Sequence, residues 1–162
     1  EADIAADCAS DDVIQLTFPE RLTDVHFISL TLADAEGNIV SDNFYWRSKD
    51  AFEGRDSIKG PCASGFEPLK DMPKASLSVK AQRIQDGNIK VTLKNTSGKI
   101  AFFNRLQLRD SAGEPLSGTM YSDNFLTILP GKTVTVTLTP CAGDAARLLV
   151  EGWNTPAKEL RL

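Results

Sequence analysis

Aromatic residues with polar neighbours are the side chains in this sequence whose types and spacing best suit a binding site. The candidates are Tyr45, Trp46, Tyr121, Asp123, Asn124 and Trp153. Aromatic rings stack on the apolar faces of sugar rings, and flanking carboxylate and amide groups exchange hydrogen bonds with sugar hydroxyls. The same rings also serve as contacts between neighbouring domains. We therefore expect these residues to contact a carbohydrate or another domain.

Packing is the alternative role for each of these candidates. Adjacent residues of a strand point to opposite faces, so Tyr45 and Trp46 cannot both face one ligand. Tryptophan is mostly buried in folded proteins, which favours core or interface packing for Trp46 and Trp153. For the segment from Tyr121 to Asn124, the alternative is a hairpin connection whose side chains cap its own backbone.

Motifs for catalysis, cofactors and metals are missing from the sequence. The single histidine, His26, lies between apolar neighbours in an expected strand and is given a structural role. Cys8, Cys62 and Cys141 form no zinc motif, and both one disulfide with a leftover thiol and three free thiols remain open. Asn95-Thr96-Ser97 is a formal glycosylation sequence that also suits a simple turn. We expect no catalytic, cofactor-binding or metal-binding residue.

The composition limits the classes of partner that this chain can bind. The 162 residues carry a formal net charge of -4 and contain 41% hydrophobic residues, which suits one or two globular domains. The basic residues are scattered, which argues against nucleic acid as a main partner. There is no run of 18 apolar residues, so we expect no membrane insertion. Since the sequence begins at Glu1, we expect a mature chain or an excised fragment.

Alternation of apolar and polar residues with a period of two dominates the second half of the sequence. It is clearest over residues 77–82, 89–94 and 133–139, which are rich in Val, Ile and Thr. Such alternation is typical of strands buried on one face. Turn signals at Asp86-Gly87-Asn88 and Pro130-Gly131 separate these strands. The pattern predicts an all-β fold of eight to ten short strands arranged as a β-sandwich, with short helical turns near residues 51–55 and 142–146.

Two hairpin segments repeat one style of turn. Asp34 and Gly37 have the same D-x-x-G spacing as Asp110 and Gly113, and each pair is followed by a Ser-Asp-Asn-Phe sequence. In this spacing the aspartate can cap the turn and the glycine can take the left-handed conformation. The distances after the glycine differ, so we interpret this as a shared hairpin style and not as a duplication.

A Gly- and Pro-rich stretch over residues 49–74 divides the chain and predicts a linker. Residues 75–162 hold about seven expected strands, which fits an immunoglobulin-like β-sandwich. Residues 1–48 hold only three expected strands, too few for an independent core. These strands are 13–18, 25–34 and 39–47. We expect residues 1–48 to be the closing strands of a preceding sandwich, or an addition to a sheet of the second domain.

Three segments resemble domains of glycoside hydrolases. SLTLADAEGNIVSDNFYWRS (29–48) is similar to the closing strands of the sandwich that follows the catalytic barrel in family 2 enzymes. Residues 91–138, with their NTSGKIAFFNRLQLRD, YSDNF and LPG motifs, and LLVEGWN (148–154) resemble the C-terminal immunoglobulin-like domain of the same enzymes. The β-mannosidase and exo-β-glucosaminidase types are the most similar.

The resemblance implies a non-catalytic accessory module. Family members are modular, retaining exo-glycosidases whose two catalytic Glu residues lie on a barrel of roughly 250 residues, too large for this chain. The implied partners are the other domains of its own polypeptide, whose docking requires an exposed apolar patch, and the implied location is periplasmic or extracellular. An autonomous carbohydrate-binding module and an unrelated adhesive immunoglobulin-like domain remain as alternatives.

Overall fold

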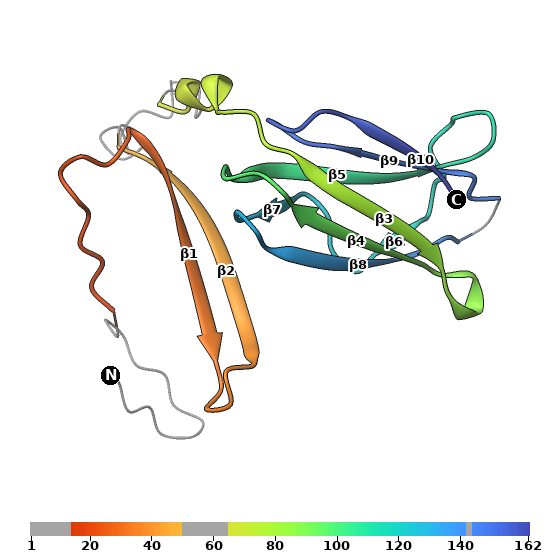
Figure 1. Cartoon of the computed structure of the whole chain (residues 1–162), viewed down its shortest axis with the longest axis horizontal. Coiled ribbons are helices and arrows are strands. Elements are labelled where there is room, and N and C mark those ends of the chain that lie inside the picture. Colours follow the sequence, from red (N-terminus) through yellow and green to blue (C-terminus); the bar gives the residue numbers. More distant parts are fainter. Residues whose placement is uncertain (1–13, 50–64, 142–143) are drawn as a thin grey trace, which may run out of the picture. The chain divides into compact units, whose positions relative to one another are not determined.

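The computed structural model describes residues 14–49, 65–141 and 144–162, and it divides the chain into two compact units. The first unit is Glu1–Lys70 and the second is Asp71–Leu162. Figure 1 shows that antiparallel strands build both units. In the described residues, no helix has the length and apolar character needed to cross a membrane.

The first unit contains a two-stranded antiparallel hairpin. Strand β1 (Val25–Ala33) pairs with β2 (Ile39–Ser48) through a register that matches Phe27 with Trp46. At the turn, Gly37 takes a φ of 85° and its N–H donates to the carbonyl of Asp34 at 3.0 Å. The D-x-x-G interpretation is therefore confirmed for this hairpin.

The second unit is a sandwich of two four-stranded sheets, in the orders β10-β9-β5-β7 and β3-β4-β8-β6. Its strands are β3 (Leu77–Arg83), β4 (Ile89–Asn95), β5 (Ala101–Arg109), β6 (Met120–Tyr121), β7 (Leu126–Ile128), β8 (Thr133–Thr139), β9 (Arg147–Glu151) and β10 (Lys158–Arg161). Two 3-10 helices, η2 (Glu67–Asp71) and η3 (Gln85–Gly87), complete the described elements. All pairings are antiparallel, and the immunoglobulin-like all-β fold predicted from the sequence is confirmed.

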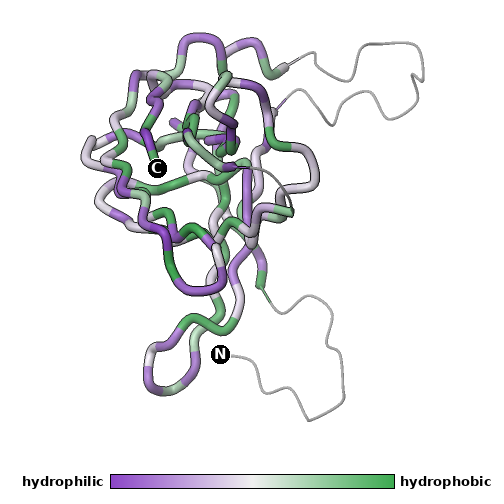
Figure 2. Tube along the Cα trace, turned by 90° about the vertical axis from the view of Figure 1, so that its right-hand side faces the viewer, coloured by the Kyte–Doolittle hydropathy of each residue, from purple (hydrophilic) through white to green (hydrophobic). Residues whose placement is uncertain are grey.

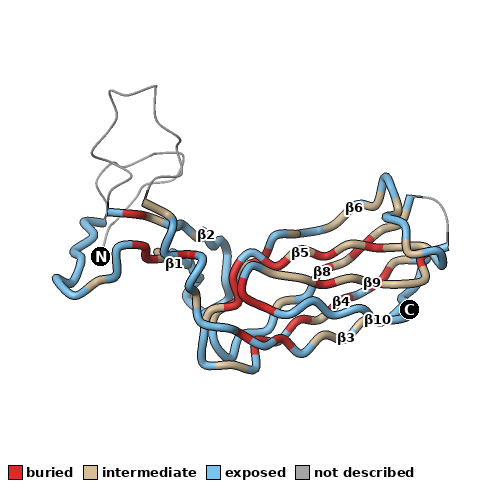
Figure 3. Tube along the Cα trace, turned by 90° about the horizontal axis from the view of Figure 1, so that it is seen from above, coloured by how far each residue is buried: buried red, intermediate tan, exposed pale blue. Residues whose placement is uncertain are grey.

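The core of the second unit lies between its two sheets. On β4, Ile89, Val91 and Leu93 are fully buried while Lys90 and Lys94 are exposed. Each such aliphatic side chain stabilises the fold by about 1.5–3 kcal/mol. Figure 2 shows hydrophobic and hydrophilic residues mixed along the strands, and Figure 3 shows buried stretches along β4, β5, β8 and β9. The alternation in the sequence therefore predicts these strands and their inward faces correctly.

Some expected elements differ in the structure. Residues 14–18 form no strand, and the ring of Phe18 lies 5.3 Å from that of His26. Residues 144–146 are not helical, and residues 51–55 and 142–143 lie outside the described residues.

The two similar hairpin segments have the same turn but differ after it. Asp110 and Gly113 form the same turn as the hairpin of the first unit, with a φ of 93° at Gly113. In contrast, the Ser-Asp-Asn-Phe sequence at residues 41–44 lies within β2, whereas at residues 122–125 it forms the loop between β6 and β7.

Candidate functional site

Tyr121 and Asn124 fasten the loop between β6 and β7 to strand β5. The hydroxyl of Tyr121 accepts a hydrogen bond from the backbone N–H of Leu108 at 3.1 Å. The amide of Asn124 accepts from the N–H of Leu106 at 2.8 Å and donates to the carbonyl of Leu106 at 3.0 Å. Exposed Asp123 accepts from the N–H of Asn124 at 2.7 Å. The structure thus brings these three candidates together, with their polar groups bonded to backbone.

Beside this loop lies an aromatic pair that the sequence did not indicate, formed by Phe103 and Phe125. Their ring centroids are 5.1 Å apart, and the side chains are 41% and 50% exposed. Both residues have positive φ, 52° at Phe103 and 56° at Phe125. For a bulky side chain this conformation is a genuine outlier that costs on the order of 1–3 kcal/mol.

Hydrogen bonds from two asparagine side chains hold the strained backbone of the aromatic pair. Asn104 is fully buried, and its amide donates to the carbonyls of Ala101 and Leu126 at 2.9 Å each. These bonds cross the bulge where the β5–β7 register shifts between Ala101 and Asn104. On the other side, the N–H of Phe125 donates to the side chain of Asn124 at 2.9 Å. The only sequence signal for this strained aromatic pair is an Asn next to each Phe.

Trp153 lies in a turn that is fixed by hydrogen bonds to Phe102 and by the close approach of Gly152 to Asn104. Its N–H donates to the carbonyl of Phe102 at 3.0 Å, and the following Asn154 accepts from the N–H of Phe102 at 2.9 Å. A Cβ on the preceding Gly152 would come within 2.2 Å of Asn104 Oδ1, so only glycine fits there. The Trp153 side chain is 53% exposed, so core burial is wrong for this residue.

Tyr45 and Trp46 point to opposite faces of the hairpin, as their adjacent positions predict, because Tyr45 pairs with Ile28 and Trp46 with Phe27. Both side chains are 49% exposed, so core burial is also wrong for Trp46. The Trp46 ring lies 5.8 Å from that of Phe66, in a tilted arrangement.

The hairpin face that carries Tyr45 also carries a stripe of aliphatic residues. Ile28, Leu30 and Leu32 alternate along β1 and therefore share that face. Leu30 is 38% exposed and Leu32 is 61% exposed. Figure 3 shows the outer part of both strands largely exposed. We call Ile28, Leu30, Leu32 and Tyr45 the hairpin stripe.

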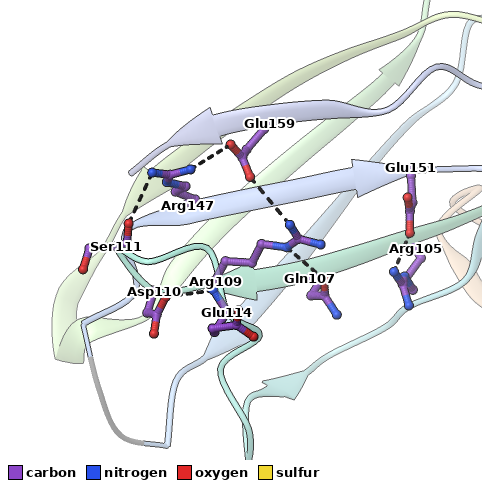
Figure 4. A network of polar contacts seen from close by, with 9 residues as sticks. All are labelled: Arg105, Gln107, Arg109, Asp110, Ser111, Glu114, Arg147, Glu151 and Glu159. Carbon is purple, nitrogen blue, oxygen red and sulfur yellow. Dashed lines mark hydrogen bonds and ion pairs between the residues drawn. The ribbon is translucent and has the colours of Figure 1, made fainter.

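A network of charged side chains covers the outward face of the sheet β10-β9-β5-β7 (Figure 4). Arg105 pairs with Glu151 across β5 and β9. Glu159 accepts from Arg147 at 3.4 Å and lies 3.9 Å from Arg109. Partly exposed pairs of this kind contribute at most about 1 kcal/mol each, so the network mainly orders this surface.

Metal ligation and histidine chemistry find no support in the described part of the chain. Residues 14–49, 65–141 and 144–162 contain no group of three His, Cys, Asp or Glu side chains that could hold a metal ion. His26 is 7% exposed and its ring lies 5.3 Å from that of Phe18. Cys141 is exposed with a free thiol, while Cys8 and Cys62 lie outside the described residues.

The Asn95 amide, which begins the formal glycosylation sequence, is fully buried. Its nitrogen donates to the carbonyls of Lys99 at 2.7 Å and Ile128 at 2.8 Å. Its oxygen accepts from the N–H and the hydroxyl of Ser97 at 3.0 and 2.8 Å. This segment therefore forms a turn that its own side chains close.

Comparisons with known proteins agree with the fold. The family model for the exo-β-D-glucosaminidase Ig-fold domain matches residues 60–155, more than half of the chain. The exo-β-D-glucosaminidase of Streptomyces avermitilis is 33% identical over 159 residues, covering 86% of this chain and 18% of the relative. That of Arthroderma benhamiae is 30% identical over 146 residues, covering 86% of this chain and 17% of the relative.

A solved structure gives the same result. The crystal structure of the Amycolatopsis orientalis exo-chitosanase CsxA superposes with a TM-score of 0.72 and 28% identity, covering 91% of this chain and 19% of that chain. The present chain thus spans under a fifth of these larger enzymes and corresponds to an accessory part of them, not to their catalytic domain. The chain belongs to the family of exo-β-D-glucosaminidase Ig-fold domains.

Proposed function

We propose that this chain is the C-terminal accessory portion of a retaining β-glycosidase of glycoside hydrolase family 2, where it braces the catalytic barrel. The names of its relatives support an enzyme that releases glucosamine from the ends of amino-sugar polymers. A β-mannosidase-like parent is the nearest alternative. The partners of the chain are then the other domains of its own polypeptide.

The hairpin stripe is the observation that carries this proposal. An isolated two-stranded hairpin is at best marginally stable in water, because it has no second layer against which to bury its apolar side chains. Leu30 and Leu32 nevertheless keep the alternation of a strand that is buried on one face. A neighbouring sandwich in the same polypeptide supplies the missing cover.

Sequencing the reading frame around this chain is the first test, since the proposal requires a barrel-encoding region upstream. The second test compares Leu32→Asn on the hairpin stripe with Thr31→Asn on the opposite face, each in the full-length polypeptide. We expect Leu32→Asn to lower the temperature of half-inactivation by a few degrees and Thr31→Asn to leave it unchanged. Equal effects, or a reading frame without a barrel, would overturn the proposal and favour an adhesive domain.

Autonomous carbohydrate binding is the second candidate function, and the half-exposed Tyr45 and Trp153 favour it. Titration of the chain with chito- and manno-oligosaccharides tests it directly. Binding with a Kd tighter than about 1 mM (roughly -4 kcal/mol) that Trp153→Ala abolishes would support it. Weaker binding, or binding that neither Tyr45→Ala nor Trp153→Ala alters, would remove it.

The location of the protein follows from the proposed activity. Polymers of amino sugars are met outside the cytoplasm, so we propose a periplasmic or extracellular location for the parent enzyme. Fractionation of the source cells, with immunodetection of this chain, tests it. Recovery with cytoplasmic markers would contradict this part of the proposal.

A further inference from the structure

We propose that the aromatic pair, Phe103 and Phe125, is a docking surface for an apolar protein surface elsewhere in the same polypeptide. The inference rests on the proposed function, and it deepens it by assigning the surface through which the second unit contacts its neighbour. The surface lies at the bulge of β5 and the end of the β6–β7 loop.

The positive φ of both residues indicates that the position of the two rings is functional. Strained conformations of bulky residues persist where surrounding contacts fix them, and they concentrate at functional sites. Here the fully buried Asn104 and the loop residue Asn124 fix both positions through bonds to backbone. The two adjoining rings are therefore held 41% and 50% exposed. Glycine at either position would relieve the backbone strain, yet both positions carry phenylalanine.

The polar groups around the pair favour a protein surface over a sugar. A carbohydrate site needs donors and acceptors that converge on the ligand. The amide groups of Asn104, Asn124 and Asn154 bond within the fold, to backbone carbonyls and N–H groups and, for the oxygen of Asn104, to the hydroxyl of Thr155. The two rings are also inclined by 40°, so they form no flat platform for one sugar ring.

The occupant is assigned from the length of the relatives. The chain spans 18% of the Streptomyces avermitilis enzyme and 19% of CsxA, so in such enzymes this domain belongs to a much longer polypeptide. Contacts between domains of one chain bury areas of roughly 600–1,500 Å², and aromatic residues are enriched at the centres of protein interfaces.

The test uses Phe125→Asn in the full-length polypeptide and in the 162-residue chain. Asparagine tolerates the left-handed conformation, so this change removes the ring without adding backbone strain. Ile84→Asn, at an apolar side chain that is 39% exposed and outside the pair, is the matched control.

In the full-length polypeptide we expect Phe125→Asn to shorten the half-life of thermal inactivation about tenfold, and Ile84→Asn less than about twofold. In the 162-residue chain both variants should unfold within about twofold of the wild-type equilibrium constant.

Hydroxyl-radical footprinting of Phe125 provides a readout that no folding defect can imitate. We expect the oxidation rate of Phe125 to be about fivefold lower in the full-length polypeptide than in the 162-residue chain, and that of Ile84 to be unchanged. Equal oxidation of Phe125 in both forms, or equal losses in both forms for Phe125→Asn, would overturn the docking surface but leave the proposed function intact. A reading frame without a barrel would overturn both.

Discussion

Asn124 pairs with Leu106 as a strand residue would, since its amide oxygen accepts the N–H of Leu106 and its amide nitrogen donates to the carbonyl of Leu106. The β6–β7 loop thereby satisfies the edge of β5 opposite β9 with a side chain instead of a backbone. Such bonds matter because an unpaired, half-buried backbone group loses its hydration without compensation. The loop that carries two of the sequence candidates, Asp123 and Asn124, is therefore first of all a structural element.

Replacing Asn124 should destabilise the second unit. Asn124→Ala removes both bonds to Leu106 and one to Phe125, and we expect a loss of about 1–3 kcal/mol in the free energy of unfolding. Urea denaturation of the 162-residue chain, followed by fluorescence, measures this loss. Asp123→Ala is the control, since Asp123 is exposed and should change stability by less than about 0.5 kcal/mol. Equal effects of the two variants would contradict the assigned role.

A methyl group at Gly152 should be as damaging as the loss of a core side chain. Its Cβ would meet Asn104 Oδ1 at 2.2 Å and Thr155 Oγ1 at 2.3 Å, and these two atoms belong to one buried hydrogen bond. We expect Gly152→Ala to lower stability by at least about 1–3 kcal/mol. Gly98→Ala is the control, since a Cβ there meets nothing within 4 Å. Thermal denaturation that cannot distinguish the two variants would show that the turn relaxes.

The sequence predicts which residues of a strand share a face, but not whether anything covers that face. Alternation over residues 89–94 and 133–139 correctly gives β4 and β8, because both lie inside a sandwich that this chain completes. The same alternation over β1 leaves Leu32 exposed, because no described residue covers that face of the hairpin. Core packing of Trp46 and Trp153 is wrong for a related reason, because a residue type carries only an average tendency, while interface packing of both residues stays a prediction.

The aromatic pair shows a second limit of sequence interpretation. Phe102 and Phe103 are adjacent apolar residues, and strict alternation would place one of them outward. The alternation of residues does not reveal the bulge at Ala101–Asn104, which gives Phe103 its positive φ. That geometry depends on the buried amide of Asn104 and on Leu126, which lies 22 residues away in the chain. Contacts over this separation leave no local periodicity to detect.

Asn95 should carry no glycan in the folded protein, despite its Asn-x-Ser sequence. Its amide nitrogen, the atom that a glycan would modify, donates to Lys99 and Ile128 inside the fold. Intact-mass analysis of the chain secreted from a glycosylating host should therefore give the unmodified mass. Asn95→Ala should also destabilise the fold by about 1–3 kcal/mol, because two carbonyls lose their donor. A folded, glycosylated protein would contradict both expectations.

The turn of the hairpin should depend on pH through Asp34. The side-chain hydrogen bond from Asn38 is the main cause that holds the pKa of the Asp34 carboxyl below its ordinary value of 3.8, and the backbone N–H of Asn38 adds to it. Because the folded state lowers this pKa, the carboxylate stabilises the turn above the unfolded pKa, and this stabilisation is lost as the pH falls through the folded pKa.

A carboxyl titration followed by NMR should give a midpoint below 3.8 for Asp34. In Asn38→Ala the midpoint should rise towards 3.8, since the largest stabilising bond to the ionised form is gone. An unchanged midpoint in Asn38→Ala would show that the Asn38 side chain does not set the charge of this turn.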